Sequence, residues 1–307
     1  MTVSIAMTTF NGSKYIVELM DSILSQTVQP DEVVIVDDCS TDGTHEIVND
    51  YIENHQLGSW HNYKNEKNLG WRANFREAFK KCNGDIIFLC DQDDIWMPYK
   101  VEEMKSIMDQ NPKIQLLISN YAVMDIDRED KVQIVGLNRN DGSVDHFKFK
   151  SSSLSVMRPG CTYCARKSLV NQLWQRDMIT APHDAMLWGY AAIDESLYLF
   201  NRKTIQFRRH SESASTPTKS LCLSRRLGEI SYDVDIESFF LDECKERGYV
   251  RKGKLIESQL TFNTKRKQIL EEKSIIKMIF FQIKNRKHYA TLRNMLADDY
   301  VLLLKRN

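Results

Sequence analysis

Apolar and polar residues alternate in blocks along the first hundred residues. Short, β-branched runs predict strands, and segments with an apolar residue at every third or fourth position predict helices between them. The predicted strands are Val3 to Met7, Glu32 to Val36, His61 to Asn65 and Asp85 to Cys90, and the predicted helices are Ile16 to Leu24, Thr44 to Ile52 and Arg72 to Cys82. Strands that alternate with helices indicate a parallel sheet covered by helices. The pattern therefore predicts an α/β fold with a Rossmann-like, mostly parallel central sheet.

The alternation becomes less regular after Ile114. We expect a strand at Leu116 to Ser119, and a hairpin in which residues 201–203 join Tyr198–Phe200 to Thr204–Arg208. A Ser/Thr-rich stretch around residues 211–219 precedes a helical, basic remainder. These changes predict a domain at 1–215, with halves at about 1–110 and 111–215, and a smaller helical region at 216–307.

Composition adds limits on class and location. The 307 residues hold 42 Lys+Arg and 42 Asp+Glu, so no overall field favours nucleic acid. The first ten residues lack the basic region of a secretory signal, and the apolar run from Ile275 to Ile283 is interrupted by Lys277 and Gln282. Seven scattered cysteines suit a reducing compartment, and we read Cys161 and Cys164 as small residues of a buried strand. We therefore expect a cytoplasmic protein.

Polar residues gather where the predicted strands end. Thr8 to Asn11 follow the first strand, Asp37 and Asp38 the second, and Asp91 to Asp94 the fourth. Ligands of open parallel sheets bind at this edge. Clustered carboxylates repel one another unless a cation neutralises them, and oxygen ligands suit Mg²⁺ or Mn²⁺. The alternative is a solvated acidic loop that caps the helix near Pro98.

These segments together carry a resemblance to a known family. Ser4 to Gly12, Val34 to Thr44, Asn68 to Gly70 and Cys90 to Trp96 resemble the successive motifs of glycosyltransferase family 2, the inverting enzymes of the GT-A fold. The D-Q-D-D-x-W form, with its D-x-D motif, is similar to rhamnosyltransferase-like members that build bacterial surface polysaccharides. The resemblance implies that the chain transfers a sugar, rhamnose or another hexose, from a UDP- or dTDP-sugar to a glycan or lipid-linked acceptor.

The resemblance also implies roles for individual residues. The residues expected to bind the donor are Thr8, Phe10, Asn11, Asp38, Asn68, Gly70, Arg72, Asp91 and Gln92. Asp38 would accept the N3–H of the base, which favours uracil or thymine over cytosine. Asp93 and Asp91 would hold the metal ion, and His210 would complete its shell, although a solvated basic turn explains His210 equally well.

On the acceptor side, Asp184 falls where the family carries its catalytic base, beside His183. The alternative for Asp184 is a helix N-cap. Gly160 and Cys161 resemble the acceptor loop. Trp96 would face the sugar, or equally well belong to the core.

Rival readings differ in class. A haloacid dehalogenase-type phosphatase would carry its D-x-D after the first strand, and a nucleotidyltransferase would carry a glycine-rich loop there. A non-catalytic scaffold would bind the nucleotide sugar but transfer no sugar to an acceptor, and Asp184 is the residue whose replacement distinguishes the two. In the tail, Ile275, Ile276, Ile279 and Phe280 suit the inner face of an anionic plasma membrane, while packing against the catalytic domain or a partner is the slightly favoured alternative.

Overall fold

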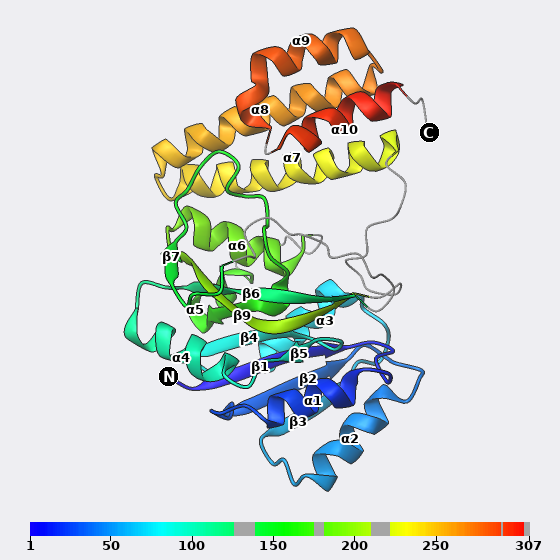
Figure 1. The fold of residues 1–307 in the computed structure, drawn as a ribbon, viewed down its shortest axis with the longest axis vertical. Coiled ribbons are helices and arrows are strands. Elements are labelled where there is room, and N and C mark those ends of the chain that lie inside the picture. The colour runs from blue at the N-terminus through cyan, green and yellow to red at the C-terminus, as the bar shows by residue number, and fades with distance from the viewer. Residues whose placement is uncertain (126–138, 175–180, 210–221, 290, 304–307) are drawn as a thin grey trace. The chain divides into compact units, whose positions relative to one another are not determined.

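A computed structural model describes residues 1–125, 139–174, 181–209, 222–289 and 291–303. Its central sheet has nine strands in the order β3-β2-β1-β4-β8-β6-β9-β5, with β7 paired to β9 (Figure 1). Strands β3, β2, β1 and β4 are parallel neighbours. Strand β8 is antiparallel to both β4 and β6, so β6 runs in the same direction as β4, and β9 pairs in parallel with β6. The predicted mostly parallel α/β sheet is confirmed.

The elements of the sheet and its flanks have the following bounds. The strands are β1 (Val3–Thr9), β2 (Glu32–Asp37), β3 (Trp60–Lys64), β4 (Ile86–Asp91), β5 (Ile95–Trp96), β6 (Leu116–Asp125), β7 (Val144–His146), β8 (Tyr163–Arg166) and β9 (Leu197–Arg209). The helices are α1 (Ile16–Leu24), α2 (Thr44–Asn54), α3 (Trp71–Lys81), α4 (Lys100–Gln110), the short η1 (Gly160–Thr162), α5 (Lys167–Gln172) and α6 (His183–Ile193).

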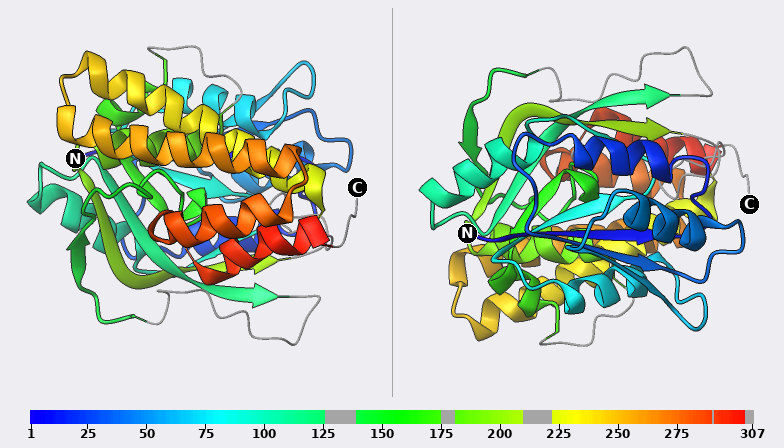
Figure 2. Two further views of the ribbon diagram at one scale, coloured as in Figure 1. Left: turned by 90° about the horizontal axis from the view of Figure 1, so that it is seen from above. Right: turned by 90° about the horizontal axis from the view of Figure 1, so that it is seen from below.

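The parallel half follows from its apolar runs. Every residue of β1 is buried, as expected for a strand covered on both faces. Helices α1 and α2 lie on one face of this half, and α3 lies on the other against β1 and β2 (Figure 2). The helices change from one face of the sheet to the other where the chain returns from β3 to β4. The chain then crosses the sheet in the opposite direction, and a right-handed crossover in that direction places its helix on the opposite face. The tips of β1, β2 and β4 consequently meet at one edge.

The predicted hairpin at residues 198–208 is wrong. Leu197–Arg209 is one continuous strand, and it pairs in parallel with β6. Asn201, Arg202 and Lys203 include no glycine or proline to turn the chain. The irregularity is absorbed instead by a shift of register opposite Ser119 to Tyr121, where Asn201 donates from its side chain to Ser143 and Asp145.

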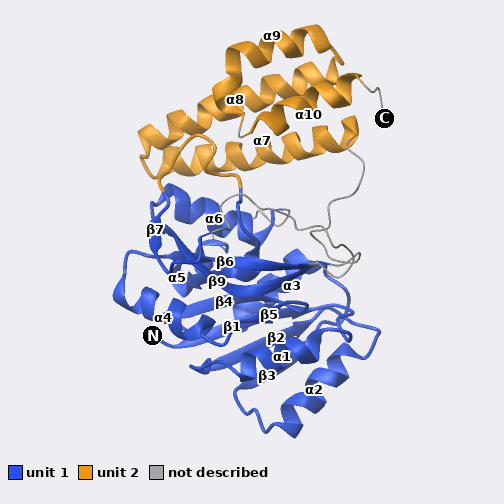
Figure 3. Ribbon diagram, viewed as in Figure 1, with its two compact units in different colours: residues 1–147, 156–216 blue, residues 148–155, 217–307 orange. Residues whose placement is uncertain are grey.

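The chain forms two compact units, shown in Figure 3. The first comprises residues 1–147 and 156–216, and the second comprises residues 148–155 and 217–307. The predicted boundary at 215/216 lies outside the described residues. Within those residues, no helix is long and apolar enough to cross a membrane.

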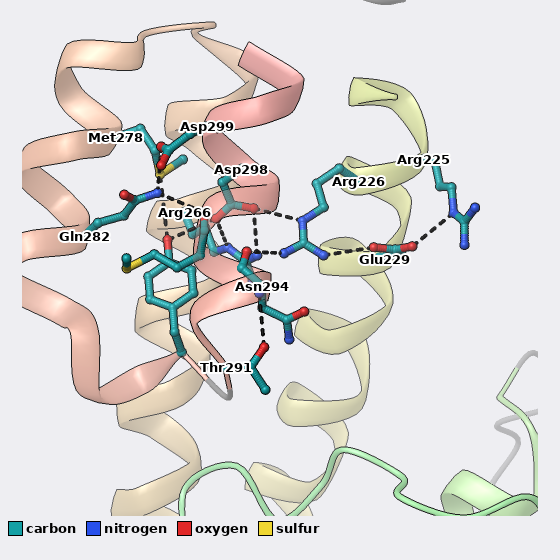
Figure 4. A network of polar contacts seen from close by, with 12 residues as sticks. Arg225, Arg226, Glu229, Arg266, Met278, Gln282, Thr291, Asn294, Asp298 and Asp299 are labelled. Carbon is teal, nitrogen blue, oxygen red and sulfur yellow. Dashed lines mark hydrogen bonds and ion pairs between the residues drawn. The ribbon is translucent and has the colours of Figure 1, made fainter. Parts of the chain in front are cut away.

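The second unit is helical, as its sequence predicts. It contains α7 (Leu223–Glu246), α8 (Val250–Glu271), α9 (Ile275–Asn285), the short η2 (Arg286–His288) and α10 (Leu292–Leu303). A polar network ties these helices together (Figure 4). Asp298 is fully buried and accepts from Arg226 Nε at 2.8 Å, from Arg266 Nε at 2.6 Å and from Tyr289 Oη at 3.0 Å. Two guanidinium groups thus compensate one buried carboxylate.

Glu237 on α7 makes the stability of this unit depend on pH. Burial and the nearby Asp233 raise the pKa of Glu237 to about 8, although Asn263 donates to its Oε1 at 2.8 Å. The folded unit therefore keeps the proton while the unfolded chain loses it. The contribution to stability falls as pH rises from the ordinary glutamate value toward 8.

We expect Glu237→Gln to remove this dependence. The unfolding free energy of the variant relative to the wild type should rise by on the order of 2–4 kcal/mol between pH 5 and 8. Urea unfolding followed by helical circular dichroism measures the change. Tryptophan fluorescence follows the other unit separately, because all five tryptophans precede residue 217. Glu257→Gln, at an exposed position on α8, is the control. Parallel pH profiles for the wild type and Glu237→Gln would contradict the expectation.

Candidate active site

Acidic side chains converge at the tip of β4. One ligand atom each from Asp91, Asp94 and Cys161 lies within 4.8 Å of the others. Asp91 ends β4, Asp94 precedes β5, and Cys161 lies on η1, so three elements supply the group. Asp94 is 1% exposed, and its Oδ2 is buried without a hydrogen-bond partner. The two carboxylates offer the oxygen ligands that a hard divalent cation prefers, whereas the Cys161 thiol is a soft ligand that does not suit such an ion.

The carboxyl groups of this cluster resist ionisation together. Burial, followed by the charge of Asp93, raises the pKa of Asp91 to about 7, and the same two causes raise the pKa of Asp94 well above its ordinary value. The charge of Asp184 also raises the pKa of Asp91. Asp184 begins the distant α6 helix in the sequence, so the fold brings it close to the β4 tip.

Lys100 supplies a positive charge behind the cluster. Its side chain is 0% exposed, and its Nζ donates to the Cys161 carbonyl at 2.9 Å. Burial lowers the pKa of Lys100 to about 8, while neighbouring thiol and carboxyl groups oppose that shift. The ammonium lies 4.5 Å from the centre of the Trp96 ring. Trp96 is itself 2% exposed in the core, which leaves little of the ring for a sugar to contact.

Arg208, on β9, holds the acidic loop from the other side. Its backbone N–H donates to Asp94 Oδ1 at 3.0 Å, and its Nε donates to the Asp93 carbonyl at 2.7 Å. Its Nη2 donates to the Glu18 carboxylate, and the guanidinium stacks on Tyr15. The sequence analysis missed both Arg208 and Lys100, because their connections to the motif run through tertiary structure.

Asp38, at the end of β2, anchors the loop that precedes α3. Its Oδ1 accepts from the Leu69 N–H and from Asn65 Nδ2, and its Oδ2 accepts from the Gly70 N–H, each at 2.8 Å. Asn68 Oδ1 also accepts from the Gly70 N–H, at 3.0 Å. A carboxylate offers about four acceptor positions, so one on Oδ2 is left for a ligand.

Gln92 and Phe10 join the tips of β4 and β1. The Phe10 N–H donates to Gln92 Oε1 at 2.7 Å, and Gln92 Nε2 donates to the Phe10 carbonyl at 2.8 Å. A Cβ at Gly12 would lie 2.2 Å from Gln92 Oε1, so a larger residue there would displace the Gln92 side chain. The Phe10 ring is exposed, Thr8 is buried, and Asn11 Oδ1 accepts from the Thr41 N–H. The amide of Gln92 is thus committed to the backbone.

His183 and Asp184 begin α6 beside Gly160. A Cβ at Gly160 would lie 3.3 Å from the Asp184 Cβ and 3.5 Å from His183 Nε2. Asp184 Oδ1 accepts from the adjacent Ala185 N–H at 2.8 Å, but the N-cap position of α6 is Pro182, so the alternative prediction that Asp184 is the N-cap is wrong. Burial raises the pKa of Asp184, and the charge of Arg72 opposes that rise.

His183 is held neutral by its surroundings. Burial, and then the charge of Arg72, lowers the pKa of His183 to about 3. The Phe75 ring lies 4.0 Å from the imidazole, and the Trp71 ring lies 5.8 Å from it. Arg72 in turn stacks on Trp71 at 4.9 Å. A neutral imidazole beside Asp184 adds no charge to the site.

Most of the predicted site residues fall into three connected groups, and Thr8, Asn11 and Trp96 belong to none of them. The first group is linked by proximity or by charge, and it comprises Asp91, Asp93, Cys161, Asp184, Gly160, His183 and Arg72. Phe10 and Gln92 form the second group, and Asp38, Asn68 and Gly70 form the third. The predicted metal ligand His210 lies outside the described residues.

Comparisons with known proteins give the fold and the family. The chain resembles Staphylococcus aureus TarS 1–349 in complex with UDP-GlcNAc, with a TM-score of 0.60, 19% identity, and coverage of 99% of this chain and 91% of that one. It also resembles the mannosyltransferase PcManGT from Pyrobaculum calidifontis in complex with GDP-Man and Mn²⁺, with a TM-score of 0.55, 13% identity, and coverage of 99% and 88%. These likenesses confirm the GT-A type of fold.

Sequence relatives match a shorter part. An uncharacterized protein from Mycobacterium tuberculosis is 31% identical over 146 residues, which are 46% of this chain and 42% of that protein. Escherichia coli chondroitin synthase is 36% identical over 137 residues, 44% of this chain and 19% of the synthase. The putative teichuronic acid biosynthesis glycosyltransferase TuaG of Bacillus subtilis is 32% identical over 106 residues, 34% and 41% respectively. The chain thus spans less than half the length of each of these relatives.

The family itself is decided by a longer match. The model of "Glycosyl transferase family 2" matches residues 4–171, which is more than half of the 307 residues and includes β1, β2 and the acidic cluster. The chain belongs to glycosyl transferase family 2.

Proposed function

We propose that this chain is a metal-dependent inverting glycosyltransferase. It moves rhamnose or another hexose from a UDP- or dTDP-sugar to a glycan or lipid-linked acceptor, in the synthesis of a cell-surface polysaccharide. It works in the cytoplasm, with peripheral contact to the inner face of the plasma membrane. The observation that carries the proposal is the proximity of Asp184 to Asp91, where each residue is half-buried and desolvation raises the pKa of its carboxyl group. Buried acids with shifted pKa values are typical of catalytic sites.

The acidic residues at the β4 tip fit a divalent cation. Asp91 and Asp93 would be the ligands, with His210 as a further candidate, and Asp94, which accepts from the Arg208 N–H, has a carboxylate oxygen within 4.8 Å of one on Asp91. The orphaned Oδ2 of Asp94 and the raised pKa of Asp91 are both relieved by a nearby positive charge. When bound, Mg²⁺ or Mn²⁺ supplies charge neutralisation for the diphosphate that leaves. The PcManGT complex contains Mn²⁺, which supports this choice.

Asp184 is the general base of the proposed reaction. It takes the proton from the acceptor hydroxyl as that oxygen forms a bond to the anomeric carbon. The bond from that carbon to the diphosphate oxygen breaks on the opposite face, and both bonding electrons leave with the diphosphate, so the configuration inverts. Burial gives the Asp184 carboxylate a raised pKa and therefore a higher affinity for the proton. The backbone N–H groups of Ala185 and Asp184, and then the charge of Arg72, oppose that rise of the pKa.

The donor lies across the tips of β1 and β2. The acceptor position left on Asp38 Oδ2 receives the N3–H of uracil or thymine, while the hydrogen bonds from residues 65–70 fix its orientation. Thr8, Phe10 and Asn11 contribute contacts from the β1 end, with the exposed Phe10 ring available to the base. Arg72, Asn68 and Gly70 cover the donor from the α3 side. The UDP-GlcNAc in the TarS complex supports a uridine donor.

The rival readings fit less well. A haloacid dehalogenase-type phosphatase would use a nucleophilic Asp after the first strand, whereas β1 ends in Thr8 and Thr9, and the acidic motif follows β4. A non-catalytic scaffold would have no use for a buried acid at position 184.

Replacement of Asp184 separates transfer from donor binding. We expect Asp184→Asn to lower kcat by about 10³-fold or more, because the variant cannot take the acceptor proton, while donor binding stays within about twofold. Product formation and donor-induced thermal stabilisation are measured on the same preparations. Asp50→Asn, at an exposed position on α2, is the matched control. Turnover by Asp184→Asn at the wild-type rate would exclude Asp184 as the base.

A donor panel tests the donor class and the metal requirement. UDP- and dTDP-sugars should raise the melting temperature with Mn²⁺ or Mg²⁺, and GDP- and CDP-sugars should raise it less. At 100-fold excess over Kd the expected stabilisation is about 2.7 kcal/mol. Chelation, or Asp93→Asn, should remove most of the effect. If no nucleotide sugar stabilises the protein with either ion, the proposed function is wrong.

Arg208 should tune metal affinity without contacting the metal. Arg208→Ala loses the bond to the Asp93 carbonyl and the pair with Glu18 but keeps the backbone donor to Asp94. We expect the Kd for Mn²⁺, measured by titration of bound ion, to rise about tenfold or more. Arg202→Ala, on the same strand but paired with Glu103, should leave it unchanged. Equal Mn²⁺ affinity for Arg208→Ala and the wild type would refute this role.

A further inference from the structure

Helices α9 and α10 carry an unusual set of exposed apolar side chains. On α9 they are Ile276, Ile279, Phe280 and Ile283, and on α10 they are Leu292, Leu296, Tyr300 and Leu303; we call these eight residues the α9–α10 face. Phe280 is 63% exposed and Ile283 is 73% exposed. Isolated exposed apolar residues are ordinary, but a stripe of them on each of two neighbouring helices is typical of a binding surface.

The spacing places the exposed apolar residues on one side of the helix, separate from the side that packs in the core. The four α9 residues follow the i, i+3, i+4, i+7 rule, so they share one stripe. The opposite side of α9 is already used, because Met278 is buried in a cluster with Leu270 and Val301. The helices lie side by side (Figure 2, left), where Gln282 donates to the Met295 carbonyl and to Asp299. The core of the unit is thus complete without these eight residues.

Positive charge flanks the α9 part of the face, whereas α10 carries the buried Asp298 and the partly exposed Asp299 beside Tyr300. From Lys273 to Ala297 the sequence holds six Lys or Arg residues and neither Asp nor Glu. Lys284 and Lys287 are exposed just beyond Ile283, and Lys277, which pairs with Glu272 at 2.6 Å, flanks the stripe on α9. An apolar stripe with lysines at its edge and no acids on the helix is typical of a helix that lies in the headgroup region of a bilayer.

We propose that the α9–α10 face docks on an anionic membrane surface. The apolar side chains enter the boundary between headgroups and acyl chains, and the flanking lysines pair with lipid phosphates. A second copy of the chain is a poorer occupant, because a two-fold contact would place the basic rims against each other. At 11 residues, α9 lies on the bilayer and does not span it.

The α9–α10 face is thereby assigned as the surface that makes the membrane contact of the proposed function, and its docking does not depend on sugar transfer. A bilayer-bound helical unit would keep the enzyme at the surface where lipid-linked acceptors are found. Docking through this face makes affinity depend on two separable features, the apolar stripe and the basic rim. Each can be removed without touching the catalytic unit, because all of these side chains are exposed on the helical unit.

Vesicle sedimentation of the full chain tests the proposal. Vesicles of phosphatidylcholine alone are compared with an equimolar mixture of phosphatidylcholine and phosphatidylglycerol. We expect binding to the mixture only. The double variant Phe280→Ser/Ile283→Ser should weaken it more than about tenfold, and Lys284→Ser/Lys287→Ser by about tenfold or more. The matched controls are Val250→Ser, which removes a 70% exposed apolar residue from α8, and Lys254→Ser on the same helix.

Several results would overturn the proposal. The wild type could fail to bind the anionic vesicles, bind phosphatidylcholine equally well, or lose as much binding in Val250→Ser as in Phe280→Ser/Ile283→Ser. A wild-type dimer in solution that Phe280→Ser/Ile283→Ser converts to a monomer, without vesicle binding, would identify a second copy as the occupant. Donor-induced thermal stabilisation is measured on the same variants and should not change. A failure of docking is therefore distinguishable from a failure of the proposed enzyme activity.

Discussion

Buried carboxylates at the tip of β4 carry a desolvation cost that the surrounding fold has to offset. Asp91 and Asp94 both have a raised pKa, chiefly because they are buried, and Asp93 adds repulsion to both. Lys100 on α4 and Arg208 on β9 both lie near these acids. Neither cation forms a direct side-chain ion pair with the two acids. The partial compensation leaves a net demand for positive charge, which suits a site that is completed by a metal ion.

Aspartates at the end of β2 have a structural role. Asp37, at the end of β2, accepts from the Thr9 hydroxyl at 2.9 Å and from the Ser40 N–H and hydroxyl at 2.9 Å and 2.5 Å. Asp38 is bonded to the loop at residues 65–70. Hydrogen bonds from N–H and O–H groups satisfy these two carboxylates, whereas Asp94 keeps an unsatisfied oxygen. Chemistry at the sheet edge therefore concentrates at the β4 tip, while the β2 tip orders the loop that would hold the donor.

The parallel half of the sheet was predictable, and the later half was less so. Val3 to Met7 and Glu32 to Val36 are nearly continuous apolar runs, each with one polar residue, and such runs identify buried strands locally. The continuity of β9 depends on its pairing with β6, which no local pattern contains. The acidic motif was likewise visible because its residues are adjacent. Arg208 was not visible, because its contact with Asp94 joins residues 114 positions apart. Trp96 looked equally suited to sugar or core, and only packing assigns it to the core.

The helical unit distributes polar and apolar residues against the usual preference. It buries Asp298 completely, with two arginines to neutralise it, and leaves Ile276, Phe280 and Ile283 in solvent. A buried ion network of this kind adds little net stability, but it fixes how α7, α8 and α10 meet. Exposing large apolar residues lowers solubility without helping the fold. A helical unit that needed only stability would become more stable if the apolar residues were buried and the charged residues exposed. The arrangement is understandable if the network holds α9 and α10 together, so that the exposed apolar residues of both helices are available to a membrane.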